Sequence, residues 1–82
     1  MLAEKGGEAV NKLNKEEIRR TLRENLREFR VQSGRSQEEV AKVLGVTRPT
    51  YTYYETGKTT PSVEDLYLLS QLYGRAMEEF FQ

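Results

Sequence analysis

Apolar residues recur at helical spacing between positions 14 and 34, which predicts a long first helix. They follow one another at steps of four, four and three: Ile18, Leu22, Leu26 and Phe29. Such steps place all four side chains on one face of a helix, where they can be buried together. Asn14 followed by Glu17 forms a capping-box pattern that marks the start of this helix, and Gly34 marks its end.

Two shorter helices are predicted directly after it. Ser36 caps a helix over 36–45, and Glu39 completes a second capping box. The buried face of this helix is predicted to consist of Val40, Ala41 and Leu44. Thr47 caps a third helix over 47–57, in which Pro49 falls in the first turn, where its missing N–H costs little.

A fourth helix and a closing turn are predicted in the remainder of the chain. Ser62 caps the helix and Gly74 ends it. Its inward-facing residues are expected to be Val63, Leu66, Leu69 and Tyr73. A last helical segment over 76–81 offers Met77, Phe80 and Phe81 as a closing flap. Five short helices joined by connections of two to six residues, with no strand pattern, predict a compact all-α domain.

The stretch 37–54 carries the pattern of a helix-turn-helix. Ala41 is small where the third helix crosses the second, and Gly45 supplies a left-handed turn residue. Val46, Tyr51 and Tyr54 fill the angle between these two helices. Together with the two caps, these positions specify two helices joined by a tight turn.

On these residues the chain resembles the Cro and repressor type helix-turn-helix family, also called the xenobiotic response element family. The matching positions run from Leu22 in the first helix to Phe81, about three quarters of the chain. The resemblance implies a compact five-helix, lambda-repressor-like fold with its third helix in the major groove of DNA. The expected organisation is an N-terminal extension over 1–20, partly disordered or starting the long first helix, and a helix-turn-helix DNA-binding domain over 21–82.

The resemblance assigns DNA contacts position by position. The outward residues of the third helix are expected to reach bases: Arg48, Pro49, Thr52 and Tyr53. Arg48 is the best candidate for specificity, because a guanidinium can bind both O6 and N7 of guanine. The expected DNA backbone contacts are Gln37, Thr47, Thr56 and Lys58. Arg30 and Glu55 match a pair that bridges the first and third helices in relatives, so we expect a structural ion pair.

Several positions depart from the family pattern. Pro49 offers a base only shape and apolar contact, so specificity leans on the shape of the DNA. Tyr51 and Tyr54 stand where relatives carry aliphatic residues or Trp, and their hydroxyls need partners. Arg35 and Arg75 fall where relatives are usually apolar, which indicates either stems that pack along apolar surface or looser packing.

An apolar surplus on the fourth helix and at the C-terminus predicts a contact surface. Its residues are Tyr67, Leu68, Leu72, Phe80 and Phe81. Two interpretations compete: a two-fold dimer contact, or coverage by Val10, Leu13 and Ile18 of the N-terminal extension. We predict the homodimer, because the surplus lies beside the C-terminus.

The net charge of the chain is zero, but the charges are unevenly distributed. The segment 19–58 holds nine basic and five acidic residues, a net charge of +4, whereas 59–82 holds one basic and four acidic residues, a net charge of −3. One segment can therefore face phosphate while the other faces away.

The residue types present exclude most catalytic chemistry. The 82 residues include no His and no Cys, which removes the usual zinc ligands, an imidazole base and a thiol nucleophile. Adjacent carboxylates such as Glu38 and Glu39 point to different sides of a helix and lie in its first turn, where they favour the helix dipole. We therefore expect neither an enzyme nor a cofactor or metal. With no apolar run of ~20 residues and no signal peptide, we expect a cytoplasmic protein without membrane contact.

The sequence favours a sequence-specific DNA-binding transcriptional regulator. We expect a repressor that binds a palindromic operator in double-stranded DNA as a dimer. The alternative is a protein-interaction module with the same fold, such as an antitoxin or an anti-repressor partner. Neutral net charge, the tyrosines of the third helix and the N-terminal extension motivate that alternative.

Overall fold

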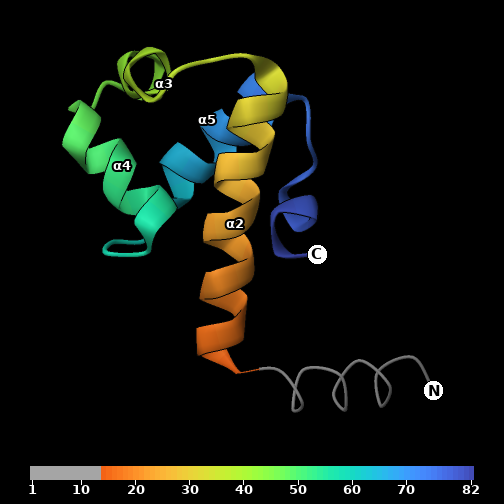
Figure 1. Cartoon of the computed structure of the whole chain (residues 1–82). Helices are drawn as coiled ribbons and strands as arrows, with labels where there is room; N and C mark the ends of the chain where they lie inside the picture. Colours follow the sequence, from red (N-terminus) through yellow and green to blue (C-terminus); the bar gives the residue numbers. More distant parts are fainter. Residues whose placement is uncertain (1–13) are drawn as a thin grey trace.

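The computed structural model describes residues 14–82, which form an all-α domain (Figure 1). Its elements are α2 (Lys15–Ser33), α3 (Gln37–Leu44), α4 (Arg48–Thr56), α5 (Val63–Tyr73) and the 3-10 helix η1 (Met77–Phe81). The last helical segment, expected over 76–81 as one of five helices, is a 3-10 helix, so the domain has four α-helices and a 3-10 turn. Ala76 offers no side-chain acceptor at its start, and five residues are too few for a stable α-helix without one.

The predicted helix starts are confirmed by hydrogen bonds. At each start a side-chain oxygen accepts from the backbone N–H three residues on: Asn14 from Glu17, Ser36 from Glu39, Thr47 from Thr50 and Ser62 from Asp65. Each of the four α-helices ends at a glycine with positive φ. Residues 20 and 21 both lie inside α2, so the expected division between extension and domain falls within one continuous helix.

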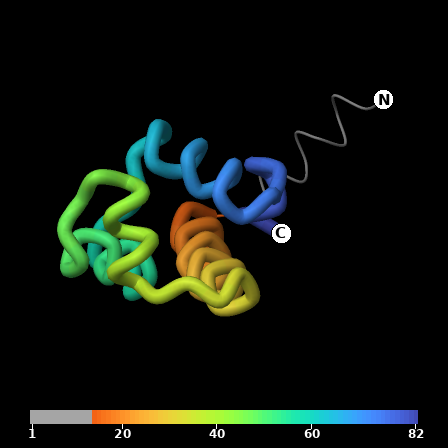
Figure 2. The backbone as a smooth tube through the Cα atoms, turned by 90° about the horizontal axis from the view of Figure 1, so that it is seen from above, coloured from red at the N-terminus to blue at the C-terminus, as the bar shows by residue number. Residues whose placement is uncertain are grey.

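The core lies between α2 and the other helices. Figure 2 shows α2 end-on, with α3 and α4 on one side and η1 on the other. The buried apolar side chains are Leu22, Leu26, Phe29, Val40, Ala41, Leu44, Tyr51, Tyr54, Leu66, Leu69 and Phe80. Two expected inward positions are exposed, Ile18 at 37% and Val63 at 75%. Both stand in the first turns of their helices, beyond the region where a neighbouring helix covers them.

Phe80 corrects one sequence expectation. It was expected on the apolar contact surface, but its side chain is fully buried and its ring meets Phe29 edge-on at 5.1 Å between centroids. Asn25 of α2 fixes this arrangement, because its Nδ2 donates to the carbonyls of Glu79, Phe80 and Gln82 at 3.0–3.3 Å. η1 is therefore part of the core of the domain.

The unusual tyrosines and Arg75 have specific partners. The Tyr51 and Tyr73 hydroxyls lie 3.2 Å apart, and Tyr54 donates to Asp65 Oδ2 at 2.7 Å. Burial, together with that carboxylate, raises the pKa of Tyr54 to about 12. Arg75 stacks on the Phe29 ring at 4.2 Å from its centroid. The departures from the family pattern are thus accommodated by polar partners and stacking.

Candidate nucleic-acid interface

A tight turn sets the angle between α3 and α4. Gly45 has φ 72°, a left-handed conformation in which a side chain is disfavoured, and its N–H donates to the carbonyls of Ala41 and Lys42. The N–H of Val46 donates to the Ala41 carbonyl at 3.0 Å. The Ala41 side chain is buried, as expected where two helices cross. These residues form the helix-turn-helix that the sequence predicted.

The residues expected to contact bases lie on α4, and three of the four are exposed. Arg48 and Pro49 begin the helix, and Tyr53 follows one turn later, 37% exposed. The opposite face of α4 is anchored in the core by Tyr51 and Tyr54. The first turn of α4 therefore exposes a guanidinium and a proline ring, while the opposite face of the helix is held in the core.

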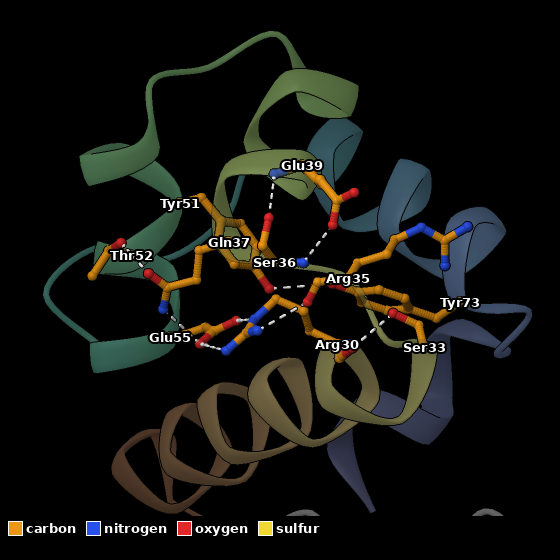
Figure 3. A network of polar contacts seen from close by, with 10 residues as sticks. All are labelled: Arg30, Ser33, Arg35, Ser36, Gln37, Glu39, Tyr51, Thr52, Glu55 and Tyr73. Atoms are coloured by element: carbon orange, nitrogen blue, oxygen red, sulfur yellow. Dashed lines mark hydrogen bonds and ion pairs between the residues drawn. The ribbon is translucent and has the colours of Figure 1, made fainter.

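Thr52 and Gln37 are engaged inside the domain (Figure 3). Thr52 Oγ1 donates to Gln37 Oε1 at 2.8 Å, and Gln37 Nε2 donates to Glu55 Oε1 at 3.1 Å. Both side chains are half-buried. They hold the first turn of α3 to the outer side of α4. The sequence did not predict these two hydrogen bonds. Their partners are 15 and 18 positions apart in the chain, and no local sequence pattern pairs residues at such distances.

Arg30 and Glu55 form an ion pair with two hydrogen bonds (Figure 3). Arg30 Nε lies 2.6 Å from Glu55 Oε2, and Nη2 lies 3.2 Å from Oε1. Arg30 Nη1 also donates to the Arg35 carbonyl at 3.0 Å. Only 14% of the Arg30 side chain and 4% of the Glu55 side chain are exposed. The pair is therefore largely removed from solvent screening.

The ion pair shifts the pKa of both partners. Burial acts to raise the pKa of Glu55, but hydrogen bonds from Arg30, Tyr51 and Gln37 outweigh it, so the pKa lies below the ordinary value. The hydrogen bond to Glu55 raises the pKa of Arg30. Both groups are therefore held in their charged forms, which maintains the geometry of the α2–α4 contact.

The expected backbone-contact residues flank both ends of α4. Thr47 caps its start, and its Oγ1 lies 2.9 Å from that of Thr50. At its other end Thr56 Oγ1 donates to the Tyr53 carbonyl at 3.3 Å. Lys58 Nζ sits over the Tyr53 ring, 4.4 Å from its centroid. The exposed strip thus runs from Thr47 to Lys58 and includes a positive charge near each end.

The expected dimer residues divide into exposed and covered ones. On α5, Tyr67 is 54% and Leu68 41% exposed, and Phe81 of η1 is 42% exposed. Leu72 is half-buried against the core, and Phe80 is fully buried. Val10 and Leu13, which were considered as an alternative cover, lie outside the described residues. Of the expected dimer residues, Tyr67, Leu68 and Phe81 are therefore the exposed ones.

In residues 14–82, no cluster of carboxylates has the arrangement of a metal site. In the same part of the chain, no helix has the length and apolar character needed to cross a membrane.

Comparisons with known proteins identify the class. The family model described as Helix-turn-helix matches residues 26–80. An uncharacterized HTH-type transcriptional regulator of Archaeoglobus fulgidus is 38% identical over 60 residues, covering 73% of this chain and 86% of that protein. The cryptic phage CTXphi transcriptional repressor RstR of Vibrio cholerae is 39% identical over 54 residues, covering 66% of this chain and 49% of that repressor.

A solved structure shows the same architecture. The hypothetical transcription factor NHTF from Neisseria is similar with a TM-score of 0.73 and 26% identity, covering 83% of this chain and 76% of that one. Fold, site and comparisons together define a DNA-binding transcription regulator that is not an enzyme. The chain belongs to the helix-turn-helix family of the Cro and repressor type.

Proposed function

We propose that this protein is a repressor that binds a two-fold symmetric operator as a dimer, with α4 in the major groove. The observation that carries the proposal is the placement of Arg48 and Pro49, which are exposed at the first turn of a helix anchored on its other face. Helices docked in this way read base edges with their N-terminal residues.

Arg48 is the principal base-reading residue of the proposal. A guanidinium binds O6 and N7 of guanine together, and such a contact contributes about 1–3 kcal/mol of discrimination. Tyr53 reaches a thymine methyl group or a phosphate. Pro49 adds shape and apolar contact but no hydrogen bond. Thr52 contributes less than an exposed threonine, because its hydroxyl already donates to Gln37.

Backbone contacts from both ends of the motif set the register of the complex. Gln37 Nε2 carries two hydrogens and donates one to Glu55, so the other is available to a phosphate. Thr47, Thr56 and Lys58 border α4 and complete this set. With about six phosphate contacts per complex, the logarithm of affinity should fall against the logarithm of salt concentration with a slope of roughly −5.

The dimer in the proposal uses the exposed apolar residues of α5 and η1. Tyr67 and Leu68 are consecutive exposed residues of α5, and Phe81 adds a third exposed side chain. A two-fold dimer presents two copies of α4 to half-sites one helical turn apart. Occupation of the operator then blocks polymerase, and RstR, a relative, is named as a repressor.

Selection of bound sequences from a random DNA pool at about 100 mM salt tests the proposal. Wild type should recover a palindromic site, and Arg48→Ala should lose its preference while circular dichroism shows an intact fold. Lys42→Ala is the matched control, because it removes an exposed positive charge from α3 without touching α4. If the folded wild type enriches no DNA sequence, the proposal is wrong, and the alternative of a module that binds a protein partner takes its place.

A further inference from the structure

Apart from Glu16 and Arg20, the acidic residues and the arginines of α2 lie on two different sides of the helix. Basic residues recur at steps of four, four and three: Arg19, Arg23, Arg27 and Arg30. Acidic residues fall at steps of seven and four along a different side: Glu17, Glu24 and Glu28. Steps of three and four keep side chains on one face of a helix. Arg30 is occupied by Glu55, so we define the basic flank as Arg19, Arg23 and Arg27.

Contacts with neighbouring elements show which way each side of α2 faces. Arg30 reaches Glu55 of α4, whereas Asn25 reaches η1. Glu28 accepts from Gln32, which in turn accepts from Arg75 just before η1. The basic flank therefore lies on the α4 side of α2, and the acidic residues lie toward η1. Charge is segregated across the domain so that its positive side is shared with the proposed DNA interface.

Arg23 brings the basic flank against the end of α4. A Cβ placed on Gly57 would lie 2.8 Å from Arg23 Cδ and 3.2 Å from its Nη1, so the two residues are in close contact. Arg19 and Arg23 line a shallow hollow with Thr59 and Thr60 of the α4–α5 loop. Lys58 stands in this same loop. The basic flank and the loop thus form one surface rich in hydrogen-bond donors.

The positive charges of this surface are available for a ligand. Within the described part of the chain, no carboxylate lies within ion-pair distance of Arg23. Arg19 has Glu16 at 3.8 Å, but the two side chains are 51% and 79% exposed, and pairs of this kind contribute little free energy. A phosphate that approaches the hollow would therefore not have to break a strong ion pair.

We infer that the basic flank is a second DNA-backbone contact, which binds phosphates next to those reached by Lys58. The inference rests on the proposed function, since it extends that interface along α2. Figure 1 shows the N-terminal half of α2 running past the C-terminal end of α4. Arg19 and Arg23 precede residues 26–80, which the family model matches.

The salt dependence of operator binding tests the inference. Each phosphate contact contributes about 0.9 to the slope of log affinity against log salt, so Arg19→Gln/Arg23→Gln should flatten the slope by about 1.8 for each bound subunit, or about 3.6 for a dimer on its operator. Arg20→Gln is the matched control, because Arg20 lines a different hollow with Ile18 and Phe81. Arg20→Gln removes one positive charge from the same helix, against two in the double variant, and should change the slope by much less than half as much. Arg23→Lys keeps the charge and should retain the contribution of Arg23.

Ethylation interference on the selected operator locates the contact. Wild type and Arg20→Gln should show sensitive phosphates beside those assigned to Lys58, and Arg19→Gln/Arg23→Gln should lose them. If wild type binds its operator and the double variant keeps both the slope and the pattern, the inference is wrong while the proposed function stands. If wild type selects no operator, the proposed function fails first. Thermal unfolding of each variant confirms that the comparison is between folded proteins.

Discussion

Arg30 Nε lies 2.6 Å from Glu55 Oε2, and the other oxygen of the same carboxylate accepts from Gln37 at 3.1 Å. One side chain of α4 is therefore tied to α2 through Arg30 and to α3 through Gln37. This nearly buried carboxylate therefore supports the orientation of α4 against both helices, together with the Gly45 turn and the buried tyrosines of α4. Substitutions here should alter the stability of the domain and the position of Arg48 together.

Removal of Arg30 alone should destabilise the domain more than replacement of the whole pair. Arg30→Ala leaves the Glu55 carboxylate buried without its cation, which should lower the free energy of unfolding by about 3 kcal/mol. Arg30→Met/Glu55→Leu replaces both charges with apolar groups and should cost clearly less. Urea unfolding of the variants measures the difference. An equal loss in both would show that the charge left behind carries no penalty.

Glu55 should make stability depend on pH in the acid range. Its pKa in the folded protein lies below the ordinary value of 4.5, so its contribution is complete above about pH 4.5 and is lost as the pH falls through the lower folded value. Glu55→Gln lacks this contribution. The gap in unfolding free energy between wild type and Glu55→Gln should therefore narrow below pH 4.5.

Gly57→Ala should cost more stability than Gly45→Ala. Both glycines have positive φ, which costs an L side chain about 1–2 kcal/mol. A Cβ on Gly45 meets nothing within 4 Å, but on Gly57 it would meet the outer atoms of the Arg23 side chain, which can move aside, so the additional cost at Gly57 should be small. The additional loss of unfolding free energy at Gly57 should disappear when Gly57→Ala is made in an Arg23→Ala background. Chemical denaturation of wild type, the two glycine variants, Arg23→Ala and the double variant measures this. An additional loss that persists would place the cause in the backbone.

Asn25→Ala should loosen η1. The substitution removes the donor shared by three backbone carbonyls at the C-terminus and should lower stability by about 1–2 kcal/mol. Asn25→Asp keeps the size but also lacks the donor, so it should lose at least as much. Amide hydrogen exchange should quicken over 77–82, because Phe80 leaves the core more often. Gln71→Ala, at an exposed site on α5, should leave that exchange unchanged.

Leu68→Glu should abolish the proposed dimer. It places a charge in the exposed apolar surface of α5 and η1, where a two-fold contact would bring two such charges together. Sedimentation at about 300 µM should show a wild-type dimer and a Leu68→Glu monomer. Val31→Glu is the control, since Val31 is 50% exposed, against 41% for Leu68, but lies on α2. A wild type that sediments only as monomer would remove the free dimer from the proposal.

Local signals predicted the helices well. The caps at Asn14 and Ser36 and the terminating Gly34 and Gly45 act through bonds within a few residues, so the sequence contains all the information they need. The bond between Asn25 and the terminal turn was not predicted, because Asn25 is 54 positions from Glu79. Helix positions can be predicted from neighbouring residues, whereas the packing of a short terminal turn on α2 involves a partner that is distant in the sequence.

The exposure of most of the candidate site residues was predictable from the sequence, whereas their hydrogen bonds were not. The exposure of Arg48 and Tyr53 follows from the helical period, which puts the core-facing tyrosines on the opposite side. The engagement of Thr52 with Gln37 joins two helices, and its geometry depends on the crossing angle. Phe80 was misplaced for a similar reason, since an apolar residue near a terminus is compatible with either core or surface.

α2 runs without interruption from Lys15 to Ser33, a length of about 28 Å at 1.5 Å per residue, and Arg30 near its end is bound to α4. Anything joined rigidly to the start of α2 would therefore keep a defined angle to the bases under α4. One residue inserted before the core would turn that attachment by about 100° around the helix axis. The number of residues in α2 would therefore set the direction in which a group attached to its start points, relative to the proposed operator.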